Sequence, residues 1–396
     1  MKKLTPVAYL WTRTVPCKNP RCGAVVPLVR QTWFCRKSGR RGGRFIALRV
    51  TLGEGGRPRF SLVQANCRRV EEAIAEFGFD PGSFSARGNA TCVFCGTVAD
   101  VDYVKAEARA GRMGRQLMAV VCTRAGQQGK IYLSADQVLP ELLPDDEAIR
   151  ARIEALCEET GLTVPEEPLP GCDGDEILVR SQYLPLPLYG LTRWADLFTP
   201  RQLLTLLTFA KWVRKAYDVM REEGYDEEEA RAIVTMLGLT LDKVVQLNCT
   251  LSRWKLDAEA VVDAFGRQAL PMVWDYAENV PISGLGGSWE SQLKRTIQGF
   301  LTTQDINKSV SRVTRGSATE LPYPTSFFDA VITDPPYYDN VPYADLSDFF
   351  YVWLKRTVGH LYPEHFVTEL TPKRAEIVAD PYRQGGREEA LKRSHR

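Results

Sequence analysis

Two closely spaced cysteine pairs place the strongest constraint on how this chain can fold. Cys17 and Cys22 bracket the residues KNPR, Cys92 and Cys95 bracket VF, and a glycine follows each pair. Such a knuckle, with a glycine that permits the turn, aims two thiolates at one metal ion, and four thiolates complete a closed tetrahedral zinc site. We therefore predict a zinc ribbon whose halves lie about seventy residues apart in the sequence. Isolated buried thiols are the alternative.

The segment between the cysteine pairs must be an insertion with its own structure. We expect strands at GGRFIALRVTL and RPRFSLVQ, and a hairpin at LMAVVCTRAGQQGKIYLSA, where two β-rich runs flank a turn that contains glycine. Ten cysteines without secretory features argue for metal or free thiols rather than for a disulfide framework. The remaining six have no partner at ligand spacing and are expected in the core or on the surface: Cys35, Cys67, Cys122, Cys157, Cys172 and Cys249.

Charge is distributed unevenly along the chain. Residues 1–50 contain twelve Lys or Arg and no acid, and residues 141–176 are acidic. A basic segment of this kind is typical of a protein with a polyanionic partner, while a solvated basic face balanced by another domain is the alternative. No apolar run approaches the length of a membrane span and no leader resembles a signal peptide, so we expect a cytoplasmic protein with no membrane partner.

Helical patterns dominate the middle of the chain. Residues 145–160 are predicted to form an acidic helix, followed by the Pro-rich connector VPEEPLPGCDGDE, which is the best candidate for a domain boundary. Thr199 is the predicted N-cap of a long helix with Pro200 at its first position, and Asp226 starts another with Glu229 placed for a capping box. Residues 199–265 are therefore expected to form a helical lobe.

The run FFDAVITDPPYY, residues 327–338, combines an apolar strand pattern with an abrupt polar end. A short continuous apolar strand is typical of a parallel sheet covered on both faces, and ligands bind beyond the carboxyl ends of such strands. Asp334 would lie at that edge. Pro335 and Pro336 lack N–H donors and leave free carbonyl acceptors, and Tyr337 offers a flat ring for stacking. The pattern fits a planar base with an exocyclic amine, such as adenine; a strand that ends in a stiff turn with a surface Asp is the alternative.

Methylation of that amine is the chemistry that needs this arrangement. The lone pair of the amino nitrogen is delocalised into the ring, so two acceptors, the Asp334 carboxylate and the Pro335 carbonyl, would favour the pyramidal nitrogen of the transition state. Alignment with a sulfonium methyl donor supplies the rest of the rate enhancement. A base in a duplex must be flipped out to reach such a pocket, and Tyr337 would recover the lost stacking.

These motifs together resemble the bacterial and archaeal adenine-specific DNA methyltransferases that contain a zinc ribbon. The resemblance covers most of the chain and is carried by YLWTRTVPCKNPRCGAVVPL, TCVFCG, YGLTRWADLFTPRQLL, FGRQALPMVWDYAE, GSWE and DPPYYDNVPYADLSDFFYVWLK. It implies S-adenosylmethionine and zinc as cofactors and DNA as partner. It also implies catalytic roles for Asp334, Pro335, Pro336 and Tyr337, zinc ligation by the two cysteine pairs, and donor contacts at Ser317, Ala318 and Asp334.

The chain departs from the family pattern at several positions. A donor-binding loop of the type Phe-x-Gly-x-Gly is not found; residues 283–290, SGLGGSWE, come nearest, but AENVP before them is not expected to be a buried strand, so we predict a flexible loop there. Ser317 stands where the family often has an acid. LTPVAYLW resembles a family segment that follows the second strand of the sheet, and strands expected after Tyr337 are missing, so we expect an internal piece of a larger enzyme.

The predicted fold is α/β: a partial Rossmann-like methyltransferase sheet with an inserted zinc-ribbon and β lobe and a helical lobe. The expected function is S-adenosylmethionine-dependent methylation of the adenine amine in DNA, by a chain that is inactive alone or is completed by a second polypeptide. The alternatives are a non-catalytic zinc-ribbon subunit that binds nucleic acid and a decayed remnant kept for its protein contacts. The expected segments are a core remnant at 1–14, the zinc-ribbon and β insertion at 15–135, the acidic helix and connector at 136–190, the helical lobe at 191–300 and the truncated catalytic segment at 301–396.

Overall fold

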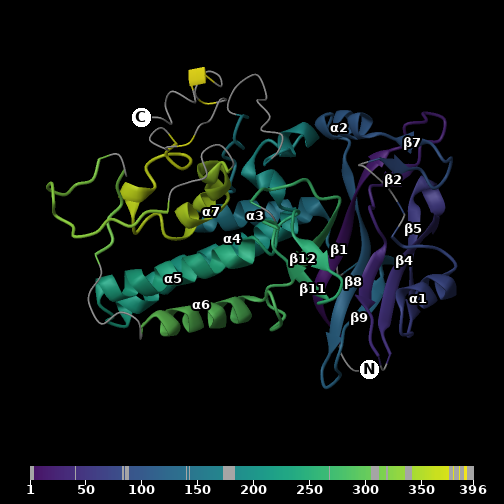
Figure 1. The fold of residues 1–396 in the computed structure, drawn as a ribbon, viewed down its shortest axis with the longest axis horizontal. Coiled ribbons are helices and arrows are strands. Elements are labelled where there is room, and N and C mark those ends of the chain that lie inside the picture. Colours follow the sequence, from purple (N-terminus) through teal and green to yellow (C-terminus); the bar gives the residue numbers. More distant parts are fainter. Residues whose placement is uncertain are drawn as a thin grey trace.

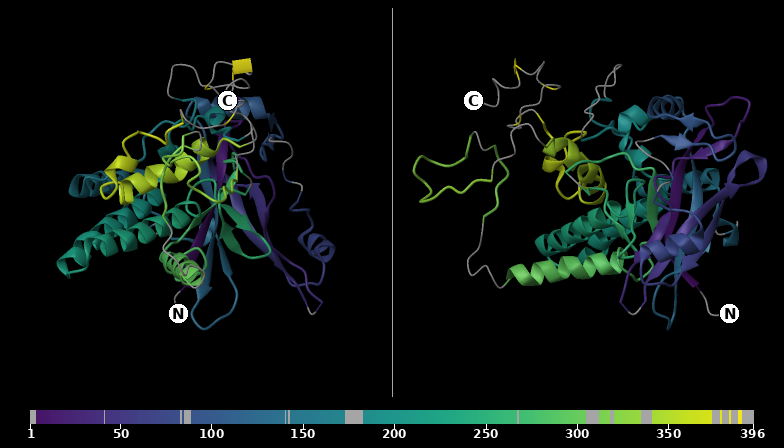
Figure 2. Two further views of the ribbon diagram at one scale, coloured as in Figure 1. Left: turned by 60° about the vertical axis from the view of Figure 1, so that its left-hand side comes forward. Right: turned by 45° about the vertical axis from the view of Figure 1, so that its right-hand side comes forward.

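The fold combines a β-rich half with a helical half (Figure 1), which confirms the expected mixed α/β class. The computed structural model describes residues 4–40, 42–82, 84, 89–139, 141, 143–172, 183–266, 268–304, 312–317, 320–334, 341–373, 378, 383 and 388–389. Within these residues the long helices extend away from the strands, and the two further views in Figure 2 show the same separation.

The main sheet is built around one long central strand. Strand β1 (Leu4–Pro16) pairs with β8 on one side and with β12 and the short β2 on the other, and β9 lies beyond β8. These partners are β2 (Val25–Pro27), β8 (Gly114–Arg124), β9 (Ile131–Ser134) and β12 (Asp275–Asn279). The predicted hairpin is confirmed as β8 and β9. Every strand pairing among the described residues is antiparallel, so the parallel Rossmann-like sheet is not confirmed there.

Three smaller strand groups complete the β-rich half. The two strands predicted in the insertion are β4 and β5, which form an antiparallel sheet with β3, and helix α1 packs on this sheet through Ala73 and Phe77. The other groups are the hairpins β6–β7 and β10–β11, and helix α2 follows β7. The bounds are β3 (Trp33–Lys37), β4 (Arg44–Leu52), β5 (Pro58–Ala65), α1 (Val70–Phe77), β6 (Ala90–Thr91), β7 (Val98–Ala99), α2 (Val101–Arg109), β10 (Arg253–Lys255) and β11 (Ala260–Val262).

The helical half contains the other five α-helices of the described residues, and the predicted starts of three of them are confirmed. Asp145 caps α3, Thr199 caps α4 with Pro200 at the first position, and Asp226 caps α5 by accepting hydrogen bonds from the backbone N–H groups of Glu228 and Glu229. The core between these helices includes Trp194, Leu206 and Trp353. The bounds are α3 (Asp146–Thr160), α4 (Pro200–Glu222), α5 (Glu227–Val245), α6 (Trp289–Gln304) and α7 (Tyr343–Thr357).

Strand β12 corrects the expectation for AENVP and joins the two halves. Its residues from Tyr276 to Asn279 are buried, and it pairs with β1 after the chain has passed through α4 and α5. Polar residues tolerate this burial because they are paired: Glu278 accepts hydrogen bonds from Trp11 Nε1, at 3.0 Å, and from Arg201 Nε. The boundary expected at residue 15 falls inside β1, so residues 4–14 belong to the same sheet as β8.

The apolar run that precedes Asp334 corrects another expectation. We predicted a buried strand at residues 327–333, but the structure assigns no strand there, and the side chains of Val331 and Ile332 are 69% and 95% exposed. An apolar parallel strand is buried only when other strands and helices cover it, and no strand of the described residues pairs with this run. The segment projects from the helical half in Figures 1 and 2.

None of the described helices has the length and apolar composition needed to cross a membrane.

Candidate metal centre

The four cysteines of the two predicted knuckles come together at one end of the main sheet. Cys17 directly follows β1 and Cys22 lies in the turn before β2, while Cys92 directly follows β6 and Cys95 lies in the turn before β7. Each turn is closed by its own backbone: Cys17 N donates to Ala24 O at 2.8 Å, and Cys92 N donates to Thr97 O at 2.9 Å. Two separate hairpins thus each present a pair of thiols.

The distances between the sulfur atoms match a tetrahedral metal site. All four Sγ atoms lie within 4.8 Å of one another. Cys17 Sγ is 3.5 Å from Cys95 Sγ, and Cys22 Sγ is 3.9 Å from Cys92 Sγ. Four sulfurs bound tetrahedrally to zinc at about 2.3 Å are separated from one another by about 3.8 Å. The four thiols therefore fit a single zinc ion with small adjustments.

A positive backbone angle after each knuckle explains the glycine that follows it. Gly23 has φ +63° and Gly96 has φ +74°, a region that residues with a Cβ atom adopt rarely. Gly96 N donates to Cys92 O at 2.9 Å and so closes the second turn. The glycines allow each chain to reverse tightly enough for both thiols of a pair to face the same point.

The protein environment shifts the pKa values of two of the thiols in opposite directions. Burial raises the pKa of Cys17 to about 12, whereas hydrogen bonding to Thr97 lowers the pKa of Cys95 to about 6. Cys17 and Cys92 are buried and Cys95 is exposed. Since zinc binds thiolates, metal binding must displace the protons that remain on the cluster, and this makes the affinity depend on pH.

The knuckles are also held together by contacts outside the sulfur cluster. Lys18, inside the first knuckle, forms an ion pair with Asp100, the N-cap of α2 just after the second hairpin. Tyr103 of α2 donates from its hydroxyl to Pro16 O at 3.2 Å. An apolar layer packs beneath these contacts and includes Val15, Val26, Ala99 and Val104. These contacts bring the two cysteine pairs together independently of the sulfur atoms.

The remaining cysteines behave as predicted for residues outside a metal site. Cys35, Cys122 and Cys249 are buried in the core, and Cys67, Cys157 and Cys172 are half-buried. In the parts of the chain that the structure describes, no other group of His, Cys, Asp or Glu side chains is placed to hold a metal.

The predicted methyltransferase residues lie mostly outside the described part of the chain. Pro335, Pro336 and Tyr337 are not among the described residues, and neither is Ala318. Asp334 is exposed at the end of the segment 320–334, and Ser317 is half-buried in an isolated bridge with Glu320. The described residues therefore do not bring Ser317 and Asp334 into an enclosed site.

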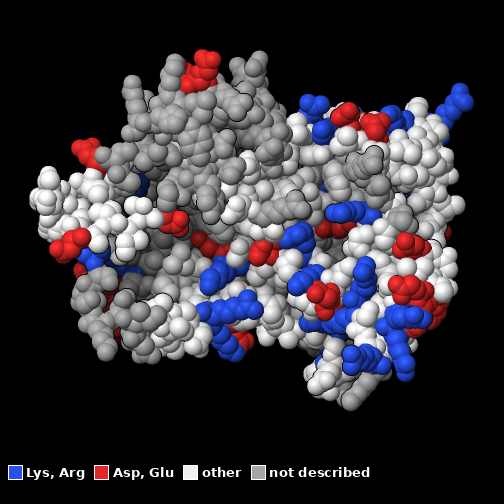
Figure 3. All heavy atoms as spheres, in the orientation of Figure 1, with Lys and Arg blue, Asp and Glu red and all other residues white. Residues whose placement is uncertain are grey.

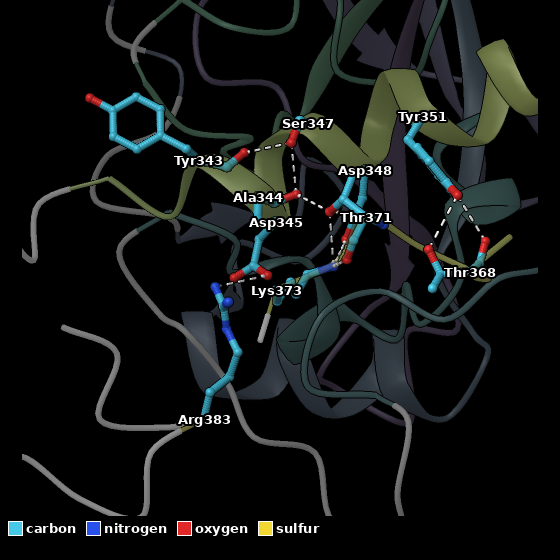
Figure 4. Close-up of polar contacts among 10 residues, drawn as sticks. All are labelled: Tyr343, Ala344, Asp345, Ser347, Asp348, Tyr351, Thr368, Thr371, Lys373 and Arg383. Carbon is cyan, nitrogen blue, oxygen red and sulfur yellow. Dashed lines mark hydrogen bonds and ion pairs between the residues drawn. The ribbon is translucent and has the colours of Figure 1, made fainter. Parts of the chain in front are cut away.

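Helix α7, which begins nine residues after Asp334, carries buried acids that the sequence analysis missed (Figure 4). The Asp348 side chain is fully buried and accepts hydrogen bonds from Lys373 Nζ at 2.7 Å, Thr371 N at 2.9 Å and Thr371 Oγ1 at 2.5 Å. Asp345, one turn earlier, lies 3.4 Å from Arg383 Nη2. A buried carboxylate is tolerated only with such partners, so these acids hold the chain after α7 against the helix.

A sequence signal for these acids does exist. Asp345 and Asp348 lie three residues apart in a helix rich in aromatic residues, which places both on one face of that helix. Acids on a buried face predict cationic or hydrogen-bonding partners, but the sequence does not identify Thr371, Lys373 or Arg383 as those partners.

The glycine-rich residues 283–290 form a turn that is held by the protein itself. Asn279 Nδ2 donates to Gly287 O at 2.7 Å, and Gly287 N donates to Ser291 Oγ at 3.1 Å. Leu285 packs against the core of the β-rich half. A buried strand, β12, does precede this turn, contrary to expectation, and helix α6 follows it.

No family model, curated protein or solved structure matches the chain.

Proposed function

We propose that this chain acts in S-adenosylmethionine-dependent methylation of the exocyclic amine of adenine in DNA, with one structural zinc ion bound by four cysteines. The observation that carries the proposal is the convergence of Cys17, Cys22, Cys92 and Cys95 within 4.8 Å. The same sequence resemblance that assigns these cysteines to a zinc ribbon also assigns Asp334 to the methyltransferase motif. Support for the metal site therefore strengthens the assignment of the motif.

The zinc ion would have a structural role. A set of four thiolates leaves no open position on the metal for water or substrate, which is the arrangement of structural rather than catalytic zinc. Its position between the β1–β2 and β6–β7 hairpins would fix the end of the main sheet.

Asp334 is the group proposed to act on the base. Its carboxylate is exposed and so accessible to an extruded nucleotide, from which it would accept an amino N–H and hold the nitrogen in place. S-adenosylmethionine would supply the methyl group. Among the described residues, Ser317 and Asp334 do not enclose a donor, because segment 320–334 is almost wholly exposed, so these two residues do not form a fitted donor pocket.

A second candidate function is that of a non-catalytic zinc protein that binds nucleic acid and depends on a partner chain for donor binding. The observation in its favour is the exposure of the apolar run before Asp334, with which no strand of the described residues pairs, although a catalytic edge requires neighbouring strands. The two functions differ in whether this chain transfers a methyl group.

Methyl transfer to DNA tests the proposal directly. Purified protein is incubated with a mixed-sequence duplex and S-adenosylmethionine carrying a radioactive methyl group, and N6-methyladenine is measured. We expect Asp334→Ala to lower the rate by at least about 100-fold, as for the loss of a group that stabilises a transition state, with nearly unchanged DNA affinity.

Asp329→Ala is the matched control, because Asp329 is an exposed acid in the same segment. It should retain the wild-type rate. Full activity of Asp334→Ala would reject the assignment of Asp334, and a wild-type protein that binds DNA without transferring a methyl group would support the second candidate.

A further inference from the structure

Six cationic side chains lie near one another at the lower edge of the β-rich half. They come from the end of β3, the turn that follows it, the start of β4, the turn between β8 and β9, and the end of β10. Figure 3 shows several Lys and Arg side chains over the strands in its lower right part, with Asp and Glu side chains among them. We call this group the basic surface; it consists of Arg36, Lys37, Arg40, Arg44, Lys130 and Lys255.

Hydrogen bonds connect these separate elements. Arg36 N donates to Leu256 O at 3.4 Å, which places the end of β3 beside the end of β10. Arg44 Nη2 donates to Lys130 O at 2.6 Å, which places the start of β4 beside the turn between β8 and β9. The basic surface is therefore a product of the tertiary fold and not only of the local sequence.

A single buried acid, Glu259, binds two of the cations of the basic surface. Glu259, whose side chain is 5% exposed, pairs with Lys37 and with Arg44 Nη1 at 3.2 Å, and accepts a hydrogen bond from Tyr132 at 3.0 Å. Asp257 lies 3.8 Å from Lys255. Ion pairs thus join these two acids to three of the six cations, and the side chains of Arg36, Arg40 and Lys130 form none with the described residues.

The rest of the positive charge is available to a partner. Arg36 and Arg40 are exposed, and neither side chain forms an ion pair or hydrogen bond with the described residues. Burial lowers the pKa of Lys130; Glu259 opposes that shift, and the nearby charge of Lys37 adds to it. Cations held this close repel one another unless an anion lies between or above them.

An aromatic layer holds the basic surface rigid. Phe34 stacks on Tyr132 with centroids 6.2 Å apart, and Trp254 meets Tyr132 edge-on at 6.3 Å. The polar atoms of this layer are occupied, because both Tyr132 Oη and Trp254 Nε1 donate to Phe34 O. Proteins that bind single strands use exposed aromatic faces to stack bases, whereas these rings serve the protein's own packing.

We infer that the basic surface binds the phosphate backbone of duplex DNA. The inference rests on the proposed function and identifies where this chain would hold its substrate. Cations spread over several elements, with aromatic rings engaged beneath them, suit contacts with phosphates rather than stacking on unpaired bases. Arg36, Arg40 and Lys255 are the residues expected to reach the DNA. Lys37 and Arg44 pair with the buried Glu259, whereas Lys255 is exposed and lies 3.8 Å from an exposed acid, Asp257.

Fluorescence anisotropy with a labelled 20-base-pair duplex, in the absence of a methyl donor, tests the inference. We expect the triple variant Arg36→Glu, Arg40→Glu, Lys255→Glu to raise Kd by at least about tenfold near 0.1 M salt. Each lost phosphate contact should also lower the salt dependence of log Kd by about 0.9. A single-stranded oligonucleotide of the same sequence is measured in parallel.

The matched control is Arg150→Glu, Arg152→Glu, Lys215→Glu, which changes the net charge equally at exposed positions on α3 and α4. It should leave Kd nearly unchanged, since charges beyond about 10 Å are screened at this salt concentration. Equal weakening in both triple variants, or none in the first, would overturn the inference, as would clear preference for the single strand.

Methyl transfer by the wild-type protein is measured separately, so that the two proposals can fail independently. If the wild type methylates DNA while the first triple variant binds as tightly as the wild type, the basic surface alone is rejected. If the first triple variant loses duplex binding and the wild type transfers no methyl group, the surface assignment stands and the catalytic function falls.

Discussion

Asp275 has an environment that disfavours its charge. It begins β12 opposite Thr12 of β1, and its Oδ1 atom is buried without a hydrogen-bond partner among the described residues. Arg30 N donates to its other oxygen at 3.2 Å, which only partly compensates. Burial raises the pKa of Asp275 to about 7, far above the ordinary value of about 3.9.

This raised pKa predicts that stability falls with increasing pH. Between about pH 4 and pH 7 the folded protein keeps a proton that the unfolded chain releases, so this contribution is complete below pH 4 and is lost as the pH rises through 7. Asp275→Asn should remove it. Relative to wild type, we expect the variant to gain stability from pH 5 to pH 8, by roughly 3 kcal/mol, measured by urea unfolding at both pH values.

Asp329→Asn is the control for this experiment, because Asp329 is an exposed acid in segment 320–334. Its effect on the free energy of unfolding should be small and similar at both pH values. A difference between Asp275→Asn and wild type that stays constant from pH 5 to pH 8 would show that Asp275 does not titrate in this range.

At the scale of single residues, spacing predicted the metal ligands but not the buried acids. Cys17, Cys22, Cys92 and Cys95 were identifiable because ligands in a short knuckle and a following glycine leave a local signature. The partners of Glu278 and Asp348 are far away in the sequence, so no local pattern identifies Trp11 or Lys373.

Helix α4 depends on a reciprocal cap at its first turn. Thr199 Oγ1 accepts a hydrogen bond from Gln202 N at 3.2 Å, and Gln202 Oε1 accepts one from Thr199 N at 2.9 Å. Both residues are buried, so water cannot replace these contacts. We expect Thr199→Ala to lower the free energy of unfolding by about 1–2 kcal/mol, measured by urea denaturation.

Thr208→Ala on the same helix controls for the loss of a threonine. The Thr208 side chain is exposed and donates back to Leu204 O at 2.6 Å, an interaction that contributes little to helix stability. This variant should be neutral or slightly stabilised, because alanine has the higher helix propensity. Equal destabilisation by the two substitutions would argue against the cap.

At the scale of elements, helices with caps were predicted well and strands less so. The starts of α3, α4 and α5 follow from residues within one turn, since Asp145, Thr199 and Asp226 satisfy backbone donors locally. Strand β12 was missed because the burial of Glu278 depends on Arg201 of α4. The run before Asp334 was wrong as a buried strand, because apolar composition cannot supply the neighbours that a strand needs.

At the scale of the whole molecule, the path of the chain through the main sheet could not be inferred from the sequence. β1 pairs with β8 and β12, which lie about 100 and 270 residues later, and those pairings are fixed by tertiary contacts alone. The mixed α/β class followed from the predicted helices and strands and from the resemblance to methyltransferases. The antiparallel arrangement did not, because the resemblance favoured a parallel sheet.

The metal centre depends on the whole fold, because the cysteines of its two hairpins meet only when the β-rich half is folded. A zinc ion bound there would stabilise the folded chain relative to the unfolded one, and its removal by a chelator would loosen both hairpins. Cys67→Ser provides a matched control for substitution of a ligand, because Cys67 is half-buried in the same half of the molecule and lies outside the cluster.

The most direct measurement is the zinc content of freshly purified, reduced protein by inductively coupled plasma mass spectrometry. We predict about one zinc per chain in the wild type and in Cys67→Ser, and almost none in Cys92→Ser. A wild-type protein without zinc, or equal zinc content in Cys92→Ser and Cys67→Ser, would contradict the assignment of the four cysteines as a metal centre.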